Sequence, residues 1–296
     1  SPVCRIVTVA GRQGFGTGFL VAPDVVITNN HVLGSKAAVL RATAEFSFER
    51  DVRRREISGR VAALDPDRLF VTNSELDFTL VALSRSDAPP HEDFGFLPLN
   101  GEEGKIRVTA PVNIIQHPDA RRKEVIVRES YLKQLPPGRD AFAYYTGDTE
   151  KGSSGSPVLN DLWEVVALHH AGVPDMDDQG RPLDKHGSRW DPAVDPRGET
   201  IRWIANEGVR ISRIVNALRR VLPTMPQGEE GRALLTSVLD EGERAARDGG
   251  FAWLQDRPLD AHDGAGGEAA EAQFAGPQDR SVMTIPFKLK VSIEGG

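Results

Sequence analysis

Short apolar segments, each ended by glycine, proline, asparagine or aspartate, follow one another from Val3 to about Gly172. Each segment is long enough for one β-strand, and the turn residues recur too often for helical crossovers between them. This spacing is typical of an all-β barrel or sandwich and argues against a βαβ fold. The eleven predicted strands are CRIVTVAG, GTGFLVAP, DVVITNN, AAVLRAT, REISGRVAALD, DFTLVAL, VNIIQH, KEVIVRES, AFAYYTG, SPVLN and EVVALHHAG.

The pattern changes after Gly172. Residues 173–199 are polar and rich in proline and glycine, and they are too many for an ordinary hairpin, so we expect an excursion loop. TIRWIANEG then predicts a last strand. The apolar residues of 209–222 recur at helical spacing and predict a helix that stops at Pro223.

The remainder of the chain predicts an extra helix, a linker and a tail. Residues 223–249 contain a second helical pattern at 229–249, and 250–281 form an acidic, glycine- and alanine-rich linker. Residues 282–296 alternate like a strand, which either docks back on the protein or begins another module. We therefore expect a partner protein or an additional domain to be engaged through 223–296.

The charge and composition exclude several classes of partner. The formal charge of −7, from 36 basic and 43 acidic residues, offers no electrostatic reason for nucleic acid or an anionic membrane to be the partner. No run of 18 apolar residues predicts a membrane span, and the first residues lack the pattern of a signal peptide. The single cysteine, Cys4, excludes an internal disulfide and favours a cytoplasmic location, and its strand context predicts a buried structural thiol.

Three segments carry side chains suited to acyl transfer. Such chemistry needs a base, a carboxylate that orients the base, a nucleophile and N–H donors for the developing oxyanion. VVITNNHVL offers His31 at the end of a strand, NSELDFTLVAL offers Asp77 at the start of another, and KGSSGSPV offers serines between glycines. Each feature alone has an ordinary structural explanation, but together they predict a hydrolytic site whose nucleophile is one of these serines.

These motifs, in the order His, Asp, Ser, resemble those of the trypsin-like (chymotrypsin-fold) serine endopeptidases. The likeness covers about residues 3–222. Within the family, GSSGSPV, HHAGVP and NEGVR are similar to segments of the bacterial glutamyl endopeptidases. The resemblance implies a chymotrypsin-like all-β fold, in which 1–222 form two six-stranded antiparallel β-barrels with a C-terminal helix, followed by the extra helix-linker-strand tail.

The resemblance also implies a role for each residue of the site. Ser154 is the nucleophile, His31 the base and Asp77 the orienting carboxylate, and the N–H groups of Gly152 and Ser154 form the oxyanion hole. Ser153 stands where zymogens activated by their new amino terminus have an aspartate, so we expect no such activation. No cofactor and no metal are expected.

The resemblance further implies a substrate-binding pocket lined by Thr149, His169 and His170. Thr149 and His169 match the residues that receive the substrate carboxylate in glutamyl-preferring relatives, and His170 replaces a bulky tryptophan. A hydroxyl and an imidazole can both donate to a carboxylate, which predicts cleavage after Glu or Asp. In the alternative, the two histidines are ordinary strand residues whose ring nitrogens are satisfied internally.

We therefore predict a serine endopeptidase that cleaves protein or peptide substrates through an acyl-enzyme, alone or as the protease part of a larger regulatory or defence-type polypeptide. The alternative is a catalytically silent module of the same fold that binds a partner peptide.

Overall fold

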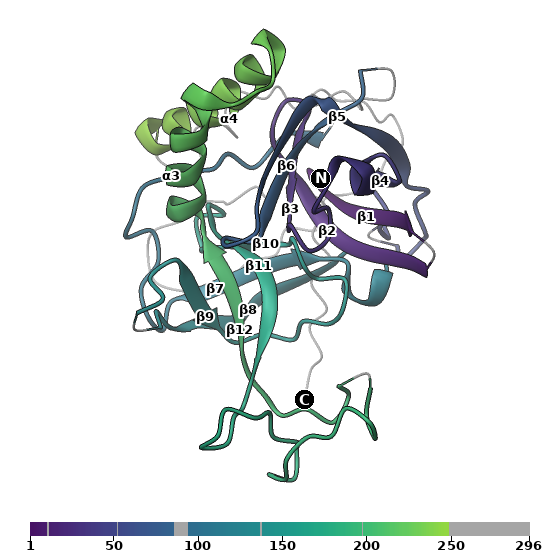
Figure 1. The fold of residues 1–296 in the computed structure, drawn as a ribbon, viewed down its shortest axis with the longest axis vertical. Helices are drawn as coiled ribbons and strands as arrows, with labels where there is room; N and C mark the ends of the chain where they lie inside the picture. Colours follow the sequence, from purple (N-terminus) through teal and green to yellow (C-terminus); the bar gives the residue numbers. More distant parts are fainter. Residues whose placement is uncertain (11, 52, 86–93, 137, 197, 249–296) are drawn as a thin grey trace.

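The computed structural model of the chain describes residues 1–10, 12–51, 53–85, 94–136, 138–196 and 198–248. The predicted linker at 250–281 and the predicted strand at 282–296 lie outside the described residues. Within the described residues the chain folds into two β-barrels with two helices packed beside them (Figure 1).

The first barrel is closed and antiparallel, with the strand order β1-β2-β3-β6-β5-β4. Alternate residues of β4 are buried, as expected for strands with one face towards a core and the other towards solvent. The strands are β1 (Val3–Ala10), β2 (Arg12–Ala22), β3 (Val25–Thr28), β4 (Ala42–Phe46), β5 (Arg60–Asn73) and β6 (Phe78–Leu83).

The second barrel repeats this architecture in the order β10-β11-β12-β9-β8-β7. Two closed, six-stranded antiparallel barrels confirm the chymotrypsin-like fold that the sequence predicted. The strands are β7 (Pro111–Gln116), β8 (Glu124–Gln134), β9 (Phe142–Tyr145), β10 (Pro157–Leu159), β11 (Val165–Pro174) and β12 (Trp203–Arg210).

The segment AAVLRAT is not the single strand that its apolar residues predicted. Its first part belongs to a short helix, α1 (Lys36–Val39), and β4 begins only at Ala42. The hydroxyl of Ser35 accepts the backbone N–H of Ala38 at 3.2 Å and so caps the helix. The cap precedes the apolar run, and this local hydrogen bond outweighs the strand preference of the residues that follow.

Strand β5 is longer than predicted, because it continues through Pro66 as far as Asn73. The register of β5 against β6 shifts between Asp65 and Phe70. The Asp65 carboxylate accepts the N–H groups of Asp67 and Arg68 within this irregular stretch. Proline is tolerated in a strand where the ladder is interrupted, so Pro66 marks a bulge and not the end of the strand.

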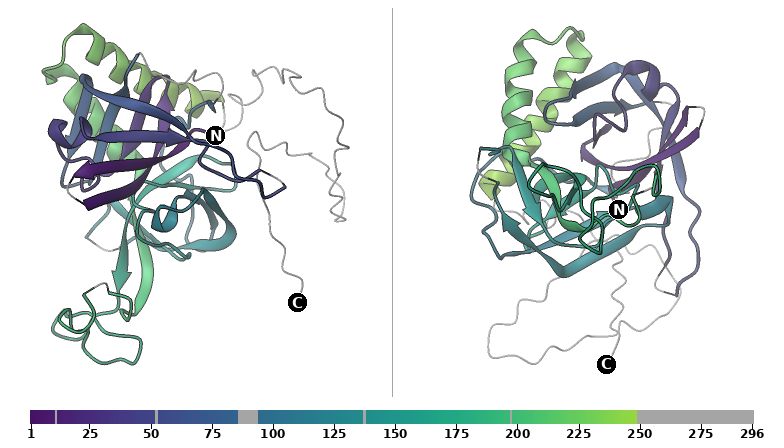
Figure 2. Two further views of the ribbon diagram at one scale, coloured as in Figure 1. Left: turned by 90° about the vertical axis from the view of Figure 1, so that its right-hand side faces the viewer. Right: turned by 60° about the horizontal axis from the view of Figure 1, so that its bottom comes forward.

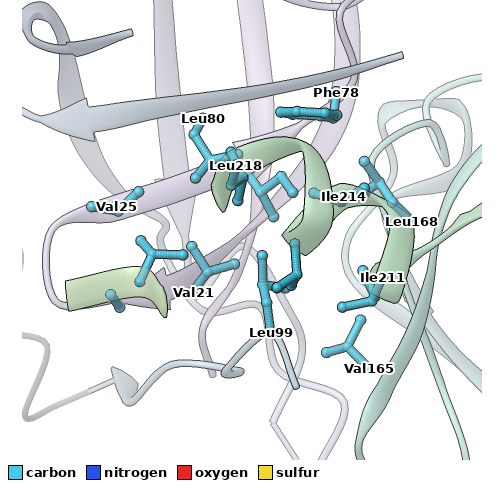
Figure 3. Packing of buried hydrophobic residues seen from close by; sticks show 14 of the residues in the cluster. Val21, Val25, Phe78, Leu80, Leu99, Val165, Leu168, Ile211, Ile214 and Leu218 are labelled. Atoms are coloured by element: carbon cyan, nitrogen blue, oxygen red, sulfur yellow. The ribbon is translucent and has the colours of Figure 1, made fainter. Parts of the chain in front are cut away.

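Helix α3 (Ile211–Val221) joins the hydrophobic cores of the two barrels. In Figure 3 its residues Ile211, Ile214 and Leu218 lie among side chains from both barrels. Phe78 of β6 and Leu168 of β11 belong to the same buried cluster. Burial of apolar surface contributes about 1.5–3 kcal/mol for each such side chain, so this shared core is a large part of what keeps the barrels together.

Helix α4 (Glu229–Asp248) packs beside α3 and against β5 of the first barrel (Figure 2). One side of the helix buries Leu235, Val238 and Leu239, and Gly242 lies directly against the backbone of Leu99. The opposite side is charged and exposed. No helix among the described residues is long and apolar enough to cross a membrane.

Residues 175–202 form the excursion between β11 and β12, and they project from the second barrel at the bottom of Figure 1. We call this segment the ribbon. Isolated bridges such as Leu183 with Arg189 and Asp184 with Ile201 hold it together. Its turns are closed by aspartates: Asp177 and Asp184 each accept N–H groups from residues two and four positions later.

Replacing Gly242 with alanine is expected to destabilise the protein by about 1–3 kcal/mol, because a Cβ at this position would collide with the Leu99 carbonyl oxygen. In an unobstructed helix the same change stabilises by about 1 kcal/mol, which makes the sign diagnostic. Urea denaturation of Gly242→Ala measures the effect, and Thr236→Ala on the exposed side of α4 is the control. A Gly242→Ala protein as stable as the control would contradict the packing of α4.

Candidate active site

Two neighbouring strands of the first barrel place His31 and Asp77 together. His31 follows the end of β3, and Asp77 immediately precedes β6. Because β3 pairs with β6 and Thr28 lies opposite Thr79, the end of one strand meets the start of the other. The predicted base and the predicted carboxylate are therefore brought together by strand pairing.

The Asp77 carboxylate holds His31 by two bonds. Oδ2 lies 2.7 Å from the ring Nδ1 of His31, and Oδ1 accepts the backbone N–H of His31 at 2.9 Å. The backbone of Asp77 has a φ of 43°, a conformation that aspartate tolerates better than most residues. The side-chain amide of Asn29 donates to the Asp77 carbonyl at 2.8 Å and fixes this turn.

Hydrogen bonds keep Asp77 ionised. Burial alone would raise the pKa of this carboxyl, but the hydrogen bonds from His170 and His31 outweigh burial and hold the pKa well below its usual range. An ionised carboxylate only accepts hydrogen bonds, so Nδ1 of His31 carries the proton. In the neutral ring the other nitrogen, Nε2, has a lone pair and can act as a base.

A buried threonine of the first barrel holds the loop that carries Ser154. Thr17 of β2 donates its N–H to the Ser154 carbonyl at 2.8 Å and its hydroxyl to the Gly152 carbonyl at 2.8 Å. The same hydroxyl accepts the N–H of His117 at 3.0 Å. Thr28 donates its hydroxyl to the Thr17 carbonyl at 2.7 Å. The loop is thus bonded to the barrel that supplies His31.

The N–H groups of Gly152 and Ser154 are oriented by the carbonyls that precede them. Lys151 O accepts the N–H of Asp119 at 2.5 Å, and Ser153 O accepts the N–H of Ser156 at 3.0 Å. In a planar trans peptide the C=O and the following N–H point in opposite directions. Both N–H groups therefore point away from these bonds, and neither donates to another described residue.

The loop requires glycine at two positions. Gly152 has a φ of 94°, and a Cβ there would lie 2.8 Å from the His117 carbonyl oxygen. Gly155 has a φ of 88°, and a Cβ there would collide with the Thr17 carbonyl oxygen. Both positions combine a left-handed conformation with a close backbone approach, which only glycine accommodates without strain.

The three serines of the loop have different surroundings. Ser153 is buried, and its hydroxyl accepts the N–H of Glu150 at 3.2 Å. Ser156 is also buried, but its hydroxyl has no hydrogen-bond partner among the described residues. Ser154 is not fully buried, and its backbone is fixed by Thr17.

Ser154 and the residue after His31 lie against the same glycine. A Cβ on Gly16 would meet the side chain of Val32 and, at 3.5 Å, the carbonyl oxygen of Ser154. Within the described contacts the Ser154 hydroxyl makes no hydrogen bond to His31. Such bonds are often long in substrate-free enzymes and shorten when substrate binds.

Of the predicted pocket residues, His169 is deeply buried beside Tyr145. Its Nδ1 lies 2.5 Å from the Tyr145 hydroxyl, while Nε2 makes no hydrogen bond to a described residue. Burial and the neighbouring charge of His170 lower the pKa of His169 to about 3, so its ring is neutral. Burial raises the pKa of Tyr145, so the phenol keeps its proton and can donate it to Nδ1.

Thr149 is joined to β12 by its hydroxyl, which donates to Oδ1 of Asn206 at 2.5 Å. The amide nitrogen of Asn206 in turn donates to the Gly147 carbonyl at 2.6 Å. Asn206 lies opposite Tyr145 in the pairing of β12 with β9. Thr149, Asn206, Tyr145 and His169 are therefore connected around one end of these strands.

His170 makes contacts that the sequence did not predict. Its Nδ1 lies 3.2 Å from Oδ2 of Asp77, and its Nε2 lies 2.7 Å from Oε1 of Glu207. Burial would lower the pKa of His170, but the hydrogen bonds that its ring donates to Asp77 and Glu207 outweigh burial and raise the pKa to about 9. A role of His170 in binding substrate stays a prediction.

Sequence reasoning missed four residues that shape the site: Thr17, Tyr145, Asn206 and Glu207. Thr17 lies in the predicted strand GTGFLVAP, and Asn206 and Glu207 lie in the NEGVR segment that resembles the family. Their partners are distant in sequence, so spacing alone could not reveal the pairs.

Two further buried titratable groups are not among the predicted site residues. Cys4 is fully buried, and burial raises the pKa of its thiol to about 12, in agreement with a structural role. His117 is buried with its pKa lowered by burial to about 3. No cluster of three metal-ligating side chains was found in the part of the chain that the structure describes.

Comparison with known proteins identifies similar sequences and folds. The family model for the trypsin-like peptidase domain matches residues 16–168. An uncharacterized protein, y4fB, of Sinorhizobium fredii is 41% identical over 234 residues, which are 72% of this chain and 35% of that protein. Secreted RxLR effector protein 73 of Plasmopara viticola is 29% identical over 181 residues, covering 53% of this chain and 41% of that protein. The chain thus spans less than half the length of either curated relative.

Among solved structures, the Rv3671c protease of M. tuberculosis in its active form has a TM-score of 0.47 and 17% identity, and the match covers 77% of this chain and 83% of that one. The serine endoprotease from Yersinia pestis has a TM-score of 0.49 and 13% identity, with coverage of 75% and 63%.

The two neighbouring histidines predict opposite dependences of stability on pH. Since folding raises the pKa of His170 from 6.5 to about 9, its contribution is complete below about pH 6.5 and is lost as the pH rises towards 9. Since folding lowers the pKa of His169 from 6.5 to about 3, its contribution is complete above about pH 6.5 and is lost as the pH falls towards 3.

In the wild type, His170 should make the unfolding free energy fall by about 2–3 kcal/mol between pH 6.5 and 9, and we expect His170→Gln to abolish this fall. His169→Gln should remove part of the loss below pH 6.5. Urea denaturation at a series of pH values measures both. An unchanged alkaline loss in His170→Gln would contradict the ion pairs around this ring.

Proposed function

The chain belongs to the trypsin-like peptidase family, and we propose that it is a serine endopeptidase in which Ser154 attacks the peptide carbonyl. The observation that carries this proposal is the pair of contacts between the Asp77 carboxylate and His31, one to the backbone N–H and one to Nδ1. These contacts leave Nε2 of His31 available to accept the serine proton. His31 returns that proton to the leaving amine, and water then hydrolyses the acyl-enzyme.

The oxyanion that forms during attack would be received by the N–H groups of Gly152 and Ser154. Their orientation supports this role, because the carbonyls before them are held by Asp119 and Ser156 on the opposite side. Donors fixed before the reaction need no reorganisation when charge develops, and this is the main electrostatic advantage of such a site.

We further propose that substrates carry Glu or Asp before the scissile bond. In this proposal the Tyr145 hydroxyl, 2.5 Å from Nδ1 of His169, donates to that nitrogen, so that Nε2 bears the ring proton and can donate to a carboxylate. The deep burial of His169 keeps the ring neutral, and a neutral donor would recognise the acidic side chain by hydrogen bonding. Thr149 is the second candidate donor, and to serve substrate its hydroxyl proton must turn from Oδ1 of Asn206 to the substrate carboxylate.

A place within a larger regulatory or defence-type polypeptide is supported by the greater length of both curated relatives. Helix α4 is additional to the two barrels and α3, and its exposed side is a surface that another part of such a polypeptide could contact. The cytoplasmic location stays a prediction from the single cysteine.

Replacing Ser154 or His31 with alanine is expected to lower kcat by about 10⁶-fold, because nucleophile and base act as a unit. Cleavage of a protein substrate measures this loss, and labelling by a fluorophosphonate probe followed by mass spectrometry locates the reactive serine. Ser156→Ala is the matched control, since this buried hydroxyl has no hydrogen-bond partner among the described residues and the backbone N–H that bonds Ser153 is kept, so activity should be unchanged.

The same experiment separates the endopeptidase from a silent peptide-binding module. Wild-type protein that is folded but neither cleaves nor labels would favour the binding module. Labelling at Ser153 or Ser156 in place of Ser154 would show that the nucleophile is assigned wrongly.

The acid preference is tested by comparing kcat/KM for matched peptides with Glu or Gln before the scissile bond. We expect the wild type to favour Glu and His169→Leu to lose this preference by about tenfold or more, since a hydrogen bond to a charged group is lost. Tyr145→Phe should weaken the preference less, because it keeps the His169 ring and removes only the hydroxyl that fixes which ring nitrogen carries the proton. Equal ratios in the wild type and His169→Leu would exclude His169 as the selecting residue.

A further inference from the structure

His170 lies between two carboxylates that come from different barrels. Asp77 precedes β6 of the first barrel, whereas Glu207 is on β12 of the second. The ring spans them, with Nδ1 3.2 Å from Asp77 Oδ2 and Nε2 2.7 Å from Glu207 Oε1. The exposed fractions of the three side chains are 16% for His170, 14% for Asp77 and 6% for Glu207, so water competes little for these bonds.

An irregularity in β11 accounts for the direction of His170. In the pairing of β11 with β12, His169 lies opposite Gly208 and Ala171 lies opposite Glu207, so His170 is the extra residue of a β-bulge. Bulges change the direction of a side chain relative to the regular alternation. Here the bulge allows consecutive histidines to serve different partners, Tyr145 for the first and Asp77 for the second.

The contacts require a doubly protonated ring. Ionised carboxylates accept hydrogen bonds but cannot donate them, so each ring nitrogen of His170 must carry a proton. Arg139 stands behind Glu207, with Nη1 2.8 Å from Oε2 and Nη2 3.1 Å from Oε1. The ring of Phe142 stacks on that of His170 at a centroid distance of 5.5 Å.

The remaining titratable groups around His170 in the described residues are the other two histidines and Tyr144, whose hydroxyl accepts from Arg139 at 3.2 Å and lies beside Glu207. His31 shares Oδ2 of Asp77 with His170, and His169 is kept neutral by burial. The two carboxylates of Asp77 and Glu207 therefore face one permanent cation, Arg139, and the imidazolium of His170. Burial of these carboxylates without such partners would be costly.

We propose that His170 is a positioning residue of the catalytic centre: its Nδ1–H holds the Asp77 carboxylate in the orientation that His31 needs, and Glu207 holds His170 in its doubly protonated form. The role rests on the proposed function, because it acts through Asp77 and His31. It adds a fourth and a fifth residue to the site and links the geometry of the base to a carboxylate of the other barrel.

The test uses His170→Phe, which keeps an aromatic ring beside Phe142 and removes both donors. We expect kcat to fall by about tenfold to a hundredfold with KM within about twofold, since a hydrogen bond to a charged group is lost at Asp77. Removing the positive charge also makes protonation of His31 easier, so the acid limb of kcat/KM moves to higher pH. His186→Phe in the exposed turn of the ribbon is the matched control and should change neither quantity.

Two further variants separate positioning from packing. His170→Gln retains an N–H that can donate to Asp77, so it should recover part of the kcat lost in His170→Phe. Glu207→Gln should lower the pH at which His170 loses its second proton. Ring ¹⁵N chemical shifts of histidine-labelled protein measure that titration in the wild type, near pH 9, and in the variant.

A His170→Phe protein with wild-type kcat, or one that loses activity with an unmoved acid limb, would overturn the positioning role. So would a wild-type His170 ring that is singly protonated at neutral pH. The ¹⁵N titrations of His170 and His31 need no activity, so they decide the role of His170 even if the wild type fails to cleave or label. That failure would count against the proposed function alone.

Discussion

The site depends on one buried side chain that crosses between the barrels. Thr17 belongs to the first barrel, which supplies the proposed base His31 and its carboxylate Asp77, yet its N–H and hydroxyl bind the loop of the second barrel that carries Ser154. A hydrogen bond is directional and loses strength within a few tenths of an ångström, so these contacts set the position of the Ser154 loop relative to His31. Thr28 completes the arrangement by fixing the Thr17 carbonyl.

Hydrophobic and polar interactions make different contributions to the association of the two barrels. The cluster around α3 buries side chains from both barrels and supplies a large, non-directional attraction. This attraction determines which faces of the two barrels meet, but it does not fix their relative position to within a few tenths of an ångström. Polar contacts also join the two barrels, among them Thr17 with Ser154, Arg5 with the Ala120 carbonyl at 2.7 Å, and His170 with Asp77. They turn approximate packing into the geometry that a proton transfer needs.

Sequence reasoning predicted most of the barrel strands, because each strand carries its own apolar residues and is ended by its own turn. It went wrong where a local hydrogen bond competes with that pattern, as at the Ser35 cap, or where a bulge admits proline, as at Pro66. The pairing of His31 with Asp77 was predictable, since strand ends and a family motif both mark it. The link from His170 to Glu207 was not, because it depends on a one-residue bulge and on residues separated by the ribbon.

The ribbon and the candidate pocket are parts of one long hairpin. Strands β11 and β12 carry His169, His170, Asn206 and Glu207 and continue outward until Pro174 pairs with Trp203, where the ribbon begins. From an evolutionary point of view, this arrangement separates two rates of change. Codons can be gained or lost beyond that last pair without altering the pairing beneath it, whereas a single codon deleted at the bulge would shift His170 out of place.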